Sequence, residues 1–317
     1  MSRIRPNILS VLVILLSIMV AAPAFSGDVN SKAGTSAFPF LKIPVGARAV
    51  AMGGAFTGLA NDESSLYYNP AGIVGLGQHR YILGYLNYFT DMQSGFAGYI
   101  REVKKDYYLA GYASYLNYGE FIEADEFGQV TGDFSGGDLL LAVTGAMQYN
   151  HSFAFGATMK FIYESLHDYS STGFAIDLGA KYSSDRKRYN AGFAIQNIGK
   201  QLSALGEEKY RLPLTFRAGG AVVPKGLPMT VSADLILPVD NDLVFALGAE
   251  YFEFKPVYLR MGWNSFGSNF RANDSDDKWA GLSFGVGFDV RKMQISYVFS
   301  PSAELGESHR ITLNGSF

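Results

Sequence analysis

From His79 to the C-terminus, large apolar residues alternate with small or polar residues at a period of two. This period places successive side chains on opposite faces, so this part of the chain is predicted to form two-faced β-strands. In residues 282–290, for example, leucine, phenylalanine and valine alternate with serine, glycine and aspartate. A soluble β-sandwich alternates as well, but its outer face usually carries charges. Here the less apolar face of each strand holds glycine, alanine and isolated charges, which is typical of the crowded lumen of a barrel.

The number and spacing of these segments define the barrel further. We count about fourteen, most of about 8 to 12 residues, and a tilted membrane strand needs about 9 to 11. Short turns around residues 104–106, 150–151, 185–187, 224–226, 255–256 and 291–292 alternate with connections of which several are long: 119–137, 198–211, 264–278 and 300–308. Short periplasmic turns and long outer loops are the outer-membrane pattern. We therefore predict an all-β fold, a transmembrane antiparallel β-barrel of about 14 strands over residues 79–317.

The composition agrees with a membrane barrel and excludes other classes. Charged residues make up 17 % of the chain, below the roughly 25 % of soluble domains, and aromatic residues make up 15 %. There is no cysteine, so neither disulfides nor a lipid on an N-terminal cysteine are available. The net charge of −3 comes without a basic tract, so we expect no nucleic-acid partner.

The first 26 residues are predicted to be a secretory signal peptide. Arg3 and Arg5 begin it, residues 8–20 form an apolar run broken only by two serines, and residues 22–26 offer small side chains for cleavage. The run is too short for a transmembrane helix, which needs about 20 apolar residues. We therefore expect export and an outer-membrane location, with lipids of that membrane around the barrel.

Residues 46–75 do not alternate, and we call them the hatch. An alanine-rich run predicts a short helix over residues 46–52, which Gly53 and Gly54 end. Asn61 and Asp62 are expected to cap a second short helical turn. The sequence Asn69-Pro70 must break that turn and begin another, which Gly72 closes. We expect the segment 27–78 to be an N-terminal extension followed by this compact hatch in the lumen, because a large barrel must be either wet or plugged.

The hatch resembles the N-terminal signature of the PorV/PorQ family of outer-membrane proteins. The similarity lies in residues 46–56 (GARAVAMGGAF), in Ala60-Asn61-Asp62 and in residues 68–72 (YNPAG). The resemblance implies a FadL-like barrel of fourteen strands with an N-terminal hatch. It also implies a role in type IX secretion or cell-surface attachment, with secreted proteins that carry C-terminal sorting domains, or secretion components, as partners. The hatch residues to which the resemblance extends are Arg48, Met52, Gly53, Asn61, Asp62, Asn69, Pro70 and Gly72; Gly54 joins them as part of the helix stop.

No catalytic, cofactor or metal motif appears in the sequence. The four histidines lack metal-ligand spacing, and HExxH, GxSxG and Walker A patterns are missing. We therefore expect no enzyme activity, no cofactor and no metal. The acidic run 273–277 could bind a cation weakly, but it lacks the glycine and terminal glutamate of an EF-hand loop. The charged residues of the lumen face are expected to pair inside the barrel: Asp177, Lys181, Arg217, Asp234 and Glu250.

The chain alternates to its last residue, Phe317. A terminal aromatic residue on an amphipathic strand resembles the signal that the outer-membrane assembly machinery recognises. Two membrane functions stay open: a PorV/PorQ-type interaction protein, and a FadL-like transporter or channel for hydrophobic small molecules with a ligand in the lumen. A soluble exported β-protein is the third alternative. The sequence alone does not decide whether the hatch gates the lumen.

Overall fold

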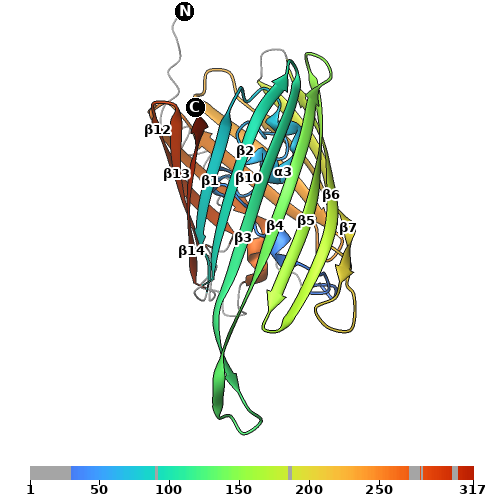
Figure 1. Cartoon of the computed structure of the whole chain (residues 1–317). Coiled ribbons are helices and arrows are strands. Elements are labelled where there is room, and N and C mark those ends of the chain that lie inside the picture. The colour runs from blue at the N-terminus through green and yellow to red at the C-terminus, as the bar shows by residue number, and fades with distance from the viewer. Residues whose placement is uncertain (1–29, 90–91, 185–187, 271–278, 280, 302–305) are drawn as a thin grey trace, which may run out of the picture.

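The computed structural model describes residues 30–89, 92–184, 188–270, 279, 281–301 and 306–317. Over these residues, fourteen antiparallel strands form one closed barrel, in which each strand pairs with its neighbours in sequence and β1 closes on β14 (Figure 1). The closing pair runs in unbroken register from Arg80 opposite Ser316 to Asn87 opposite His309. The prediction of a fourteen-stranded barrel is therefore confirmed. The predicted signal peptide, residues 1–26, lies outside the described residues.

The strands differ in length around the barrel, and the longest lie in its first half. Their bounds are β1 (Arg80–Asn87), β2 (Gln93–Lys104), β3 (Tyr107–Ala124), β4 (Val130–Gln148), β5 (Phe153–Leu166), β6 (Tyr169–Ser183), β7 (Tyr189–Ser203), β8 (Thr215–Val222), β9 (Met229–Pro238), β10 (Val244–Tyr251), β11 (Val257–Asn264), β12 (Leu282–Val290), β13 (Met293–Pro301) and β14 (Glu307–Ser316).

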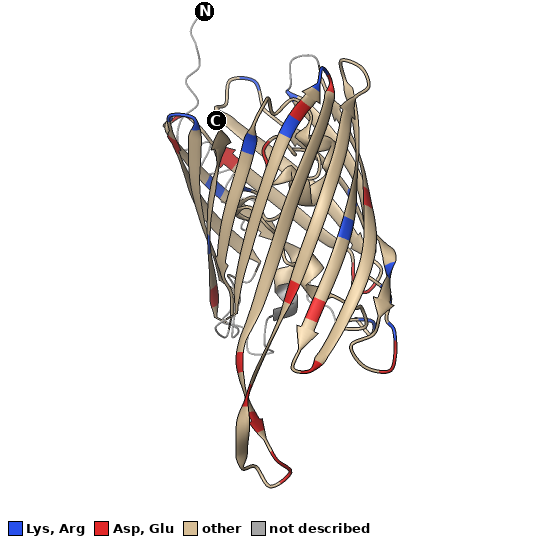
Figure 2. Cartoon of the chain, viewed as in Figure 1, with Lys and Arg blue, Asp and Glu red and all other residues tan. Residues whose placement is uncertain are grey.

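The two faces of the strands divide as the alternation predicts. In β6, Phe174 and Leu178 are exposed on the outside, whereas Ala175 and Asp177 between them are buried. Charged residues in the view of Figure 2 lie mostly near the ends of the strands. An apolar outer band with a polar interior is the pattern of a barrel in lipid. It does not fit the solvated outer face of a soluble β-protein.

Two predicted loops are corrected by the structure. Residues 119–137 belong largely to a hairpin in which β3 and β4 extend beyond the barrel wall, with Glu120 opposite Ser135 and Glu123 opposite Gly132 (Figure 1). Likewise, β7 continues through residues 198–203, which pair with β6. Both stretches are rich in polar and small residues, so they lack the apolar alternation that marks a strand inside the membrane.

The hatch and most of the residues from Ala37 up to it are buried within the barrel. They form four short helical pieces: η2 (Pro39–Lys42), α2 (Ala47–Ala51), α3 (Ser65–Tyr68) and η3 (Pro70–Ile73). A further 3₁₀ helix, η4 (Ser265–Phe270), follows β11. The predicted helix over residues 46–52 and the break at Asn69-Pro70 are confirmed. Among the described residues, no helix is both long and apolar enough to span a membrane.

The two ends of the barrel are unlike. Both termini of the barrel segment and the turn at 291–292 lie at one end, and the long β3–β4 hairpin projects from the other (Figure 1). In outer-membrane barrels short turns face the periplasm and long loops face outward. We therefore call these the periplasmic end and the outer end.

Candidate functional site in the barrel lumen

The helix α2 carries the residue that ties the hatch to the wall. Its alanines, Ala47, Ala49 and Ala51, are fully buried, since small side chains allow the helix to approach the strands closely. The backbone nitrogen of Ala47 donates a 2.8 Å hydrogen bond to Thr312 Oγ1 on β14. The one charged side chain of the helix, Arg48, reaches the neighbouring strand β10.

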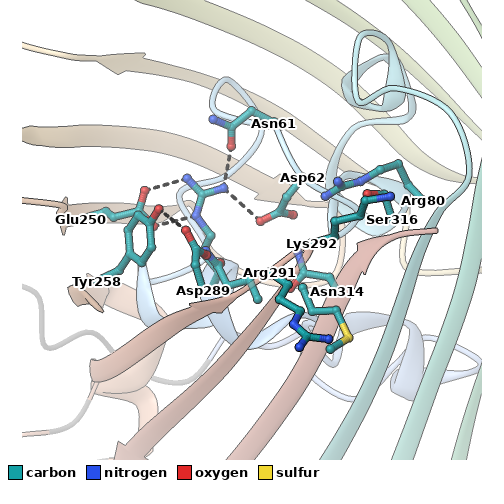
Figure 3. A pocket seen from close by; sticks show the side chains of 13 residues that line it. Asn61, Asp62, Arg80, Glu250, Tyr258, Asp289, Arg291, Lys292, Asn314 and Ser316 are labelled. Atoms are coloured by element: carbon teal, nitrogen blue, oxygen red, sulfur yellow. Dashed lines mark hydrogen bonds and ion pairs between the residues drawn. The ribbon is translucent and has the colours of Figure 1, made fainter. Parts of the chain in front are cut away.

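Arg48 binds the wall and the hatch at the same time. Its Nε and Nη2 donate two hydrogen bonds of 2.7 Å to the two carboxylate oxygens of Glu250 on β10. Its Nη1 donates to Asn61 Oδ1 at 2.7 Å and to Asp62 Oδ2 at 3.0 Å. Figure 3 shows Glu250, Asn61 and Asp62 directed toward this one point. A planar guanidinium can make such a forked contact, which a lysine cannot copy.

Glu250 is shared with a second arginine. Arg260 on β11 donates from Nε to Glu250 Oε2 at 2.7 Å, and its other nitrogens donate to Ser296 and Gln294. Burial by itself disfavours the charged form of Arg48, but the carboxylates of Glu250 and Asp62 outweigh burial and raise the pKa of Arg48 above its ordinary value. Arg48 therefore stays charged.

The two glycines after α2 have different roles. Gly53 has φ of +67°, and a methyl group on it would lie 2.5 Å from the carbonyl oxygen of Trp263 on β11. Gly54 has φ of +80°, but a methyl group there would meet nothing within 4 Å. Met52, fully buried, packs so closely that a methyl group on Gly248 would lie 2.5 Å from its carbonyl oxygen. The hatch thus touches the backbone of the wall directly, and glycine permits this approach on both sides.

The second part of the hatch follows the predicted capping only in part. Asp62 Oδ1 accepts a 2.8 Å hydrogen bond from the backbone of Ser64, but α3 itself begins at Ser65 without a side-chain cap, so the predicted cap at Asn61 and Asp62 is displaced. Asn69 caps η3 instead, because its Oδ1 accepts from Ala71 N at 3.1 Å.

Asn69, Pro70 and Gly72 lie in a closely packed part of the hatch. Asn69 Nδ2 donates to the carbonyl of Ala180 on β6 at 3.1 Å, so this asparagine also contacts the wall. Pro70 is the first residue of η3, as predicted. A methyl group on Gly72 would lie 2.5 Å from Ala60 Cβ, which explains why glycine closes the turn.

The sequence did not indicate which wall residues hold the hatch. Asp234 Oδ2 accepts hydrogen bonds from the backbone nitrogens of Phe56 at 3.1 Å and Thr57 at 2.8 Å, and Arg217 donates to Thr57 Oγ1 at 2.9 Å and to the carbonyl of Gly54 at 2.8 Å. Lys181 donates to the carbonyl of Ala60. These inward charges were predicted to form pairs inside the barrel. Among the described residues, wall pairs form between Arg217 and Asp234 at 3.4 Å, between Asp177 and Lys160 at 2.6 Å and between Glu250 and Arg260 at 2.7 Å.

The hatch separates two cavities in the lumen, each of about 400 Å³. One lies toward the periplasmic end, where charged and amide side chains line it, among them Arg48, Asp62, Arg80, Asp289 and Lys292 (Figure 3). The other lies toward the outer end, and its lining is mostly apolar, with Leu41, Ile43, Tyr67, Val244, Phe266 and Leu282. No described residue lines both cavities. The lumen thus has an apolar outer cavity and a polar inner cavity, with the hatch between them.

Two further predictions concern the described residues. Among these residues, the structure has no group of three or more histidine, aspartate or glutamate side chains that could hold a metal. Phe317 is 78 % exposed, and its ring lies 4.9 Å from that of Tyr81 on β1. Its role as an assembly signal stays a prediction.

Comparisons with known proteins identify the fold. No protein-family model matches the chain, and no curated protein sequence is significantly similar to it. Among solved structures, the toluene transporter TodX of Pseudomonas putida is similar at 14 % identity and a TM-score of 0.55, covering 85 % of this chain and 96 % of that one. A FadL homologue of Pseudomonas aeruginosa is similar at 12 % identity and a TM-score of 0.51, covering 92 % of this chain and 99 % of the other. The chain therefore has the FadL-like fold of outer-membrane β-barrels. The comparisons do not support the secretion role that the PorV/PorQ resemblance implies.

Proposed function

We propose that this chain is an outer-membrane channel that admits hydrophobic small molecules from outside, with the hatch as its stopper. The observation that carries the proposal is the apolar cavity of about 400 Å³ between the outer end and the hatch. Pockets for small ligands typically have about 300 to 1,000 Å³ and are lined mainly by apolar side chains with a few polar groups. The likeness in fold to a toluene transporter and to a FadL homologue supports the same reading.

The position of the cavity suits entry from the outside. Its lining includes Tyr88 and Phe89 just beyond the outer end of β1, and Pro39 and residues 41–44 of the segment that leads into the hatch. A molecule that enters there meets η2 and α2 before it reaches the polar inner cavity. Because the stopper is held by discrete contacts such as Arg48 with Glu250, passage requires it to move or to open locally.

A matched pair of substitutions tests the cavity. Ile236 lines it, whereas its neighbour Leu237 points outward and is exposed. With the full chain in lipid nanodiscs, we expect a labelled alkylbenzene to bind, Ile236→Trp to weaken that binding at least tenfold, and Leu237→Trp to leave it unchanged. Equal binding by nanodiscs with and without the protein would overturn the proposed function.

A second candidate is the secretion partner role, and one feature favours it. The β3–β4 hairpin projects from the outer end with exposed Phe121, Ile122 and Phe127, and residues 119–137 carry five acidic and no basic side chains. Such a surface suits a protein partner with a basic face. Capture of a secreted protein through its C-terminal domain by the full chain, but not by a chain that lacks residues 120–135, is the expected result. Retention of such a partner by both chains would exclude the hairpin as its binding surface.

A further inference from the structure

The basic residues of the barrel wall at its outer end gather in one place, around the end of β7. Among the described residues, the connections β1–β2, β3–β4, β5–β6, β9–β10, β11–β12 and β13–β14 contain no lysine or arginine. The connection from β7 to β8 contains Lys209 and Arg211, and Lys200 lies close to the end of β7 (Figure 1). All three residues are exposed. We call them the basic edge.

Lys200 faces the lipid. In the ladder between β6 and β7 it lies opposite Phe174, and opposite residues of an antiparallel pair share one face of the sheet. Phe174 is exposed on the outside of the barrel, and Ile198 and Leu202, on either side of Lys200 in the same row, are exposed as well. A long cationic side chain among apolar ones in such a row extends toward the lipid head groups.

Lys209 is held beside the end of β7. Its ammonium group donates a hydrogen bond to the carbonyl of Leu202, and the backbone nitrogen of Tyr210 donates to Gln201 Oε1 at 2.8 Å. Gln201 is itself buried, and its Nε2 donates to Ser171 Oγ on β6 at 2.7 Å. The connection is therefore fixed to the wall by a buried side chain, which keeps the charge of Lys209 close to the lipid-facing row.

The basic edge has no acidic partner in the described part of the chain. None of the ion pairs found there includes one of its three members. Glu207 and Glu208 of the same connection are exposed and also belong to none of these pairs. The carbonyl of Arg211 accepts a 2.9 Å hydrogen bond from Ala37, so its backbone is held as well. The three cations thus lie on a fixed edge that is open to the surroundings of the barrel.

A lipid of the outer leaflet offers a matching anion. That leaflet consists largely of acylated saccharides that carry phosphates at the level of the head groups, and lysine and arginine bind phosphate through charge-assisted hydrogen bonds. We propose that the basic edge binds the phosphorylated head group of such a lipid, lipid A, with its acyl chains against Phe174 and Ile198. Each cation near an anionic lipid surface contributes about 1 kcal/mol, which corresponds to about fivefold in affinity. The site lies outside the lumen, so the inference is independent of the molecule that the channel admits.

Lipid A with and without its phosphates tests the head group. The full chain, purified in detergent and freed of bound lipid, is titrated with bisphosphorylated lipid A and with lipid A from which both phosphates have been removed. Native mass spectrometry counts the bound lipid. We expect the phosphorylated form to bind at least tenfold more tightly. Equal binding of the two forms would overturn the proposal.

Paired substitutions locate the site. Lys200→Gln combined with Lys209→Gln should weaken binding of phosphorylated lipid A at least tenfold and change that of the dephosphorylated form less than threefold. Lys200→Arg combined with Lys209→Arg keeps both charges and should bind as the wild type does. Lys104→Gln combined with Lys105→Gln removes the same charge from exposed residues at the periplasmic end and should change neither affinity.

Folding of each variant is judged by heat-modifiable gel mobility. If the double glutamine variant at the basic edge fails to fold, Lys200→Gln alone should still weaken binding of phosphorylated lipid A about fivefold. An equal loss of binding in the periplasmic control would show that net charge, and not the basic edge, attracts the lipid. Unchanged binding in the folded variants of the basic edge would likewise show that the assignment is wrong.

Discussion

Arg48 and Glu250 are joined by two parallel hydrogen bonds of 2.7 Å although 202 residues separate them in the sequence. The contact links the short helix α2 of the hatch to strand β10 of the barrel wall. Glu250 also accepts from Arg260, so a single carboxylate balances two guanidinium groups in the lumen. Glu250 is therefore one of the wall residues that fix the position of the hatch.

Glu250→Gln is expected to destabilise the protein. The substitution leaves Arg48 and Arg260 buried without this carboxylate, and loss of one member of a buried ion pair costs about 3 kcal/mol or more. The free energy of unfolding in urea, measured on the full chain in lipid vesicles, should fall by that amount. Glu253→Gln, three residues further on at an exposed position, is the control and should stay within about 0.5 kcal/mol of the wild type. Equal unfolding midpoints for Glu250→Gln and the wild type would show that the contact does not hold the hatch.

The two glycines after α2 are expected to respond differently to alanine. Both have positive φ, so either substitution brings backbone strain of about 1–2 kcal/mol. Gly53→Ala also drives a methyl group against the carbonyl oxygen of Trp263, which should add about 1–3 kcal/mol, whereas Gly54→Ala meets open space. Hydrogen exchange of the hatch amides should accelerate much more in Gly53→Ala than in Gly54→Ala. Equal exchange rates in the two variants would contradict the close packing of Gly53 on β11.

Deletion of residues 47–72 is expected to leave a barrel that still inserts into membranes but leaks. The strands pair with one another throughout, so closure of the wall does not require the hatch. In planar bilayers the deletion variant should show a large increase in ionic conductance. Deletion of residues 120–135, which project beyond the wall, should leave the conductance unchanged. A deletion of the hatch that conducts no more than the wild type would refute its role as a plug.

Glu63 should make stability depend on pH. Its side chain is fully buried, and burial together with the adjacent Asp62 raises its pKa, an effect that Asn314 and Arg80 oppose but do not cancel. Because the folded protein then holds this proton more tightly than the unfolded chain does, the contribution of Glu63 is complete below the unfolded pKa of about 4.3 and is lost as pH rises through the folded pKa.

The measurement compares Glu63→Gln with the wild type across pH. The difference in their free energies of unfolding should shift in favour of the variant from pH 4 upward and become constant above the folded pKa. Glu208→Gln, at an exposed site, should show no such trend relative to the wild type. A shift in the opposite direction would mean that Arg80 dominates and that the pKa of Glu63 is lowered.

The barrel could be predicted from the sequence because lipid enforces a simple pattern. An outward position such as Phe174 must be apolar, and the lumen position beside it, Ala175, is small, so the period of two appears in the sequence itself. The pattern fails for residues 119–124 and 130–137, where both faces of β3 and β4 are outside the membrane and need no alternation. The extended hairpin was therefore predicted to be a loop.

The candidate site was predictable only in part. The local features of the hatch, such as the end of α2 at Gly53 and the break at Pro70, follow from the conformational limits of single residues. The partner of Arg48 does not, because Glu250 is 202 residues away in the sequence and lies beside it only in the folded barrel. The inward charges were predicted to pair inside the barrel, but Glu250 and Lys181 also bind the hatch, and a single sequence contains no signal for these contacts.

Transport of an apolar solute tests the central claim most directly. The full chain is reconstituted into vesicles with lipopolysaccharide in the outer leaflet, and entry of labelled ethylbenzene is compared with entry of labelled sucrose. The account predicts that the protein accelerates ethylbenzene entry, that Ile236→Trp slows it toward the rate of protein-free vesicles, and that sucrose stays excluded. Ethylbenzene entry at the protein-free rate, or equal acceleration of both solutes, would contradict a hatch-gated channel for hydrophobic molecules.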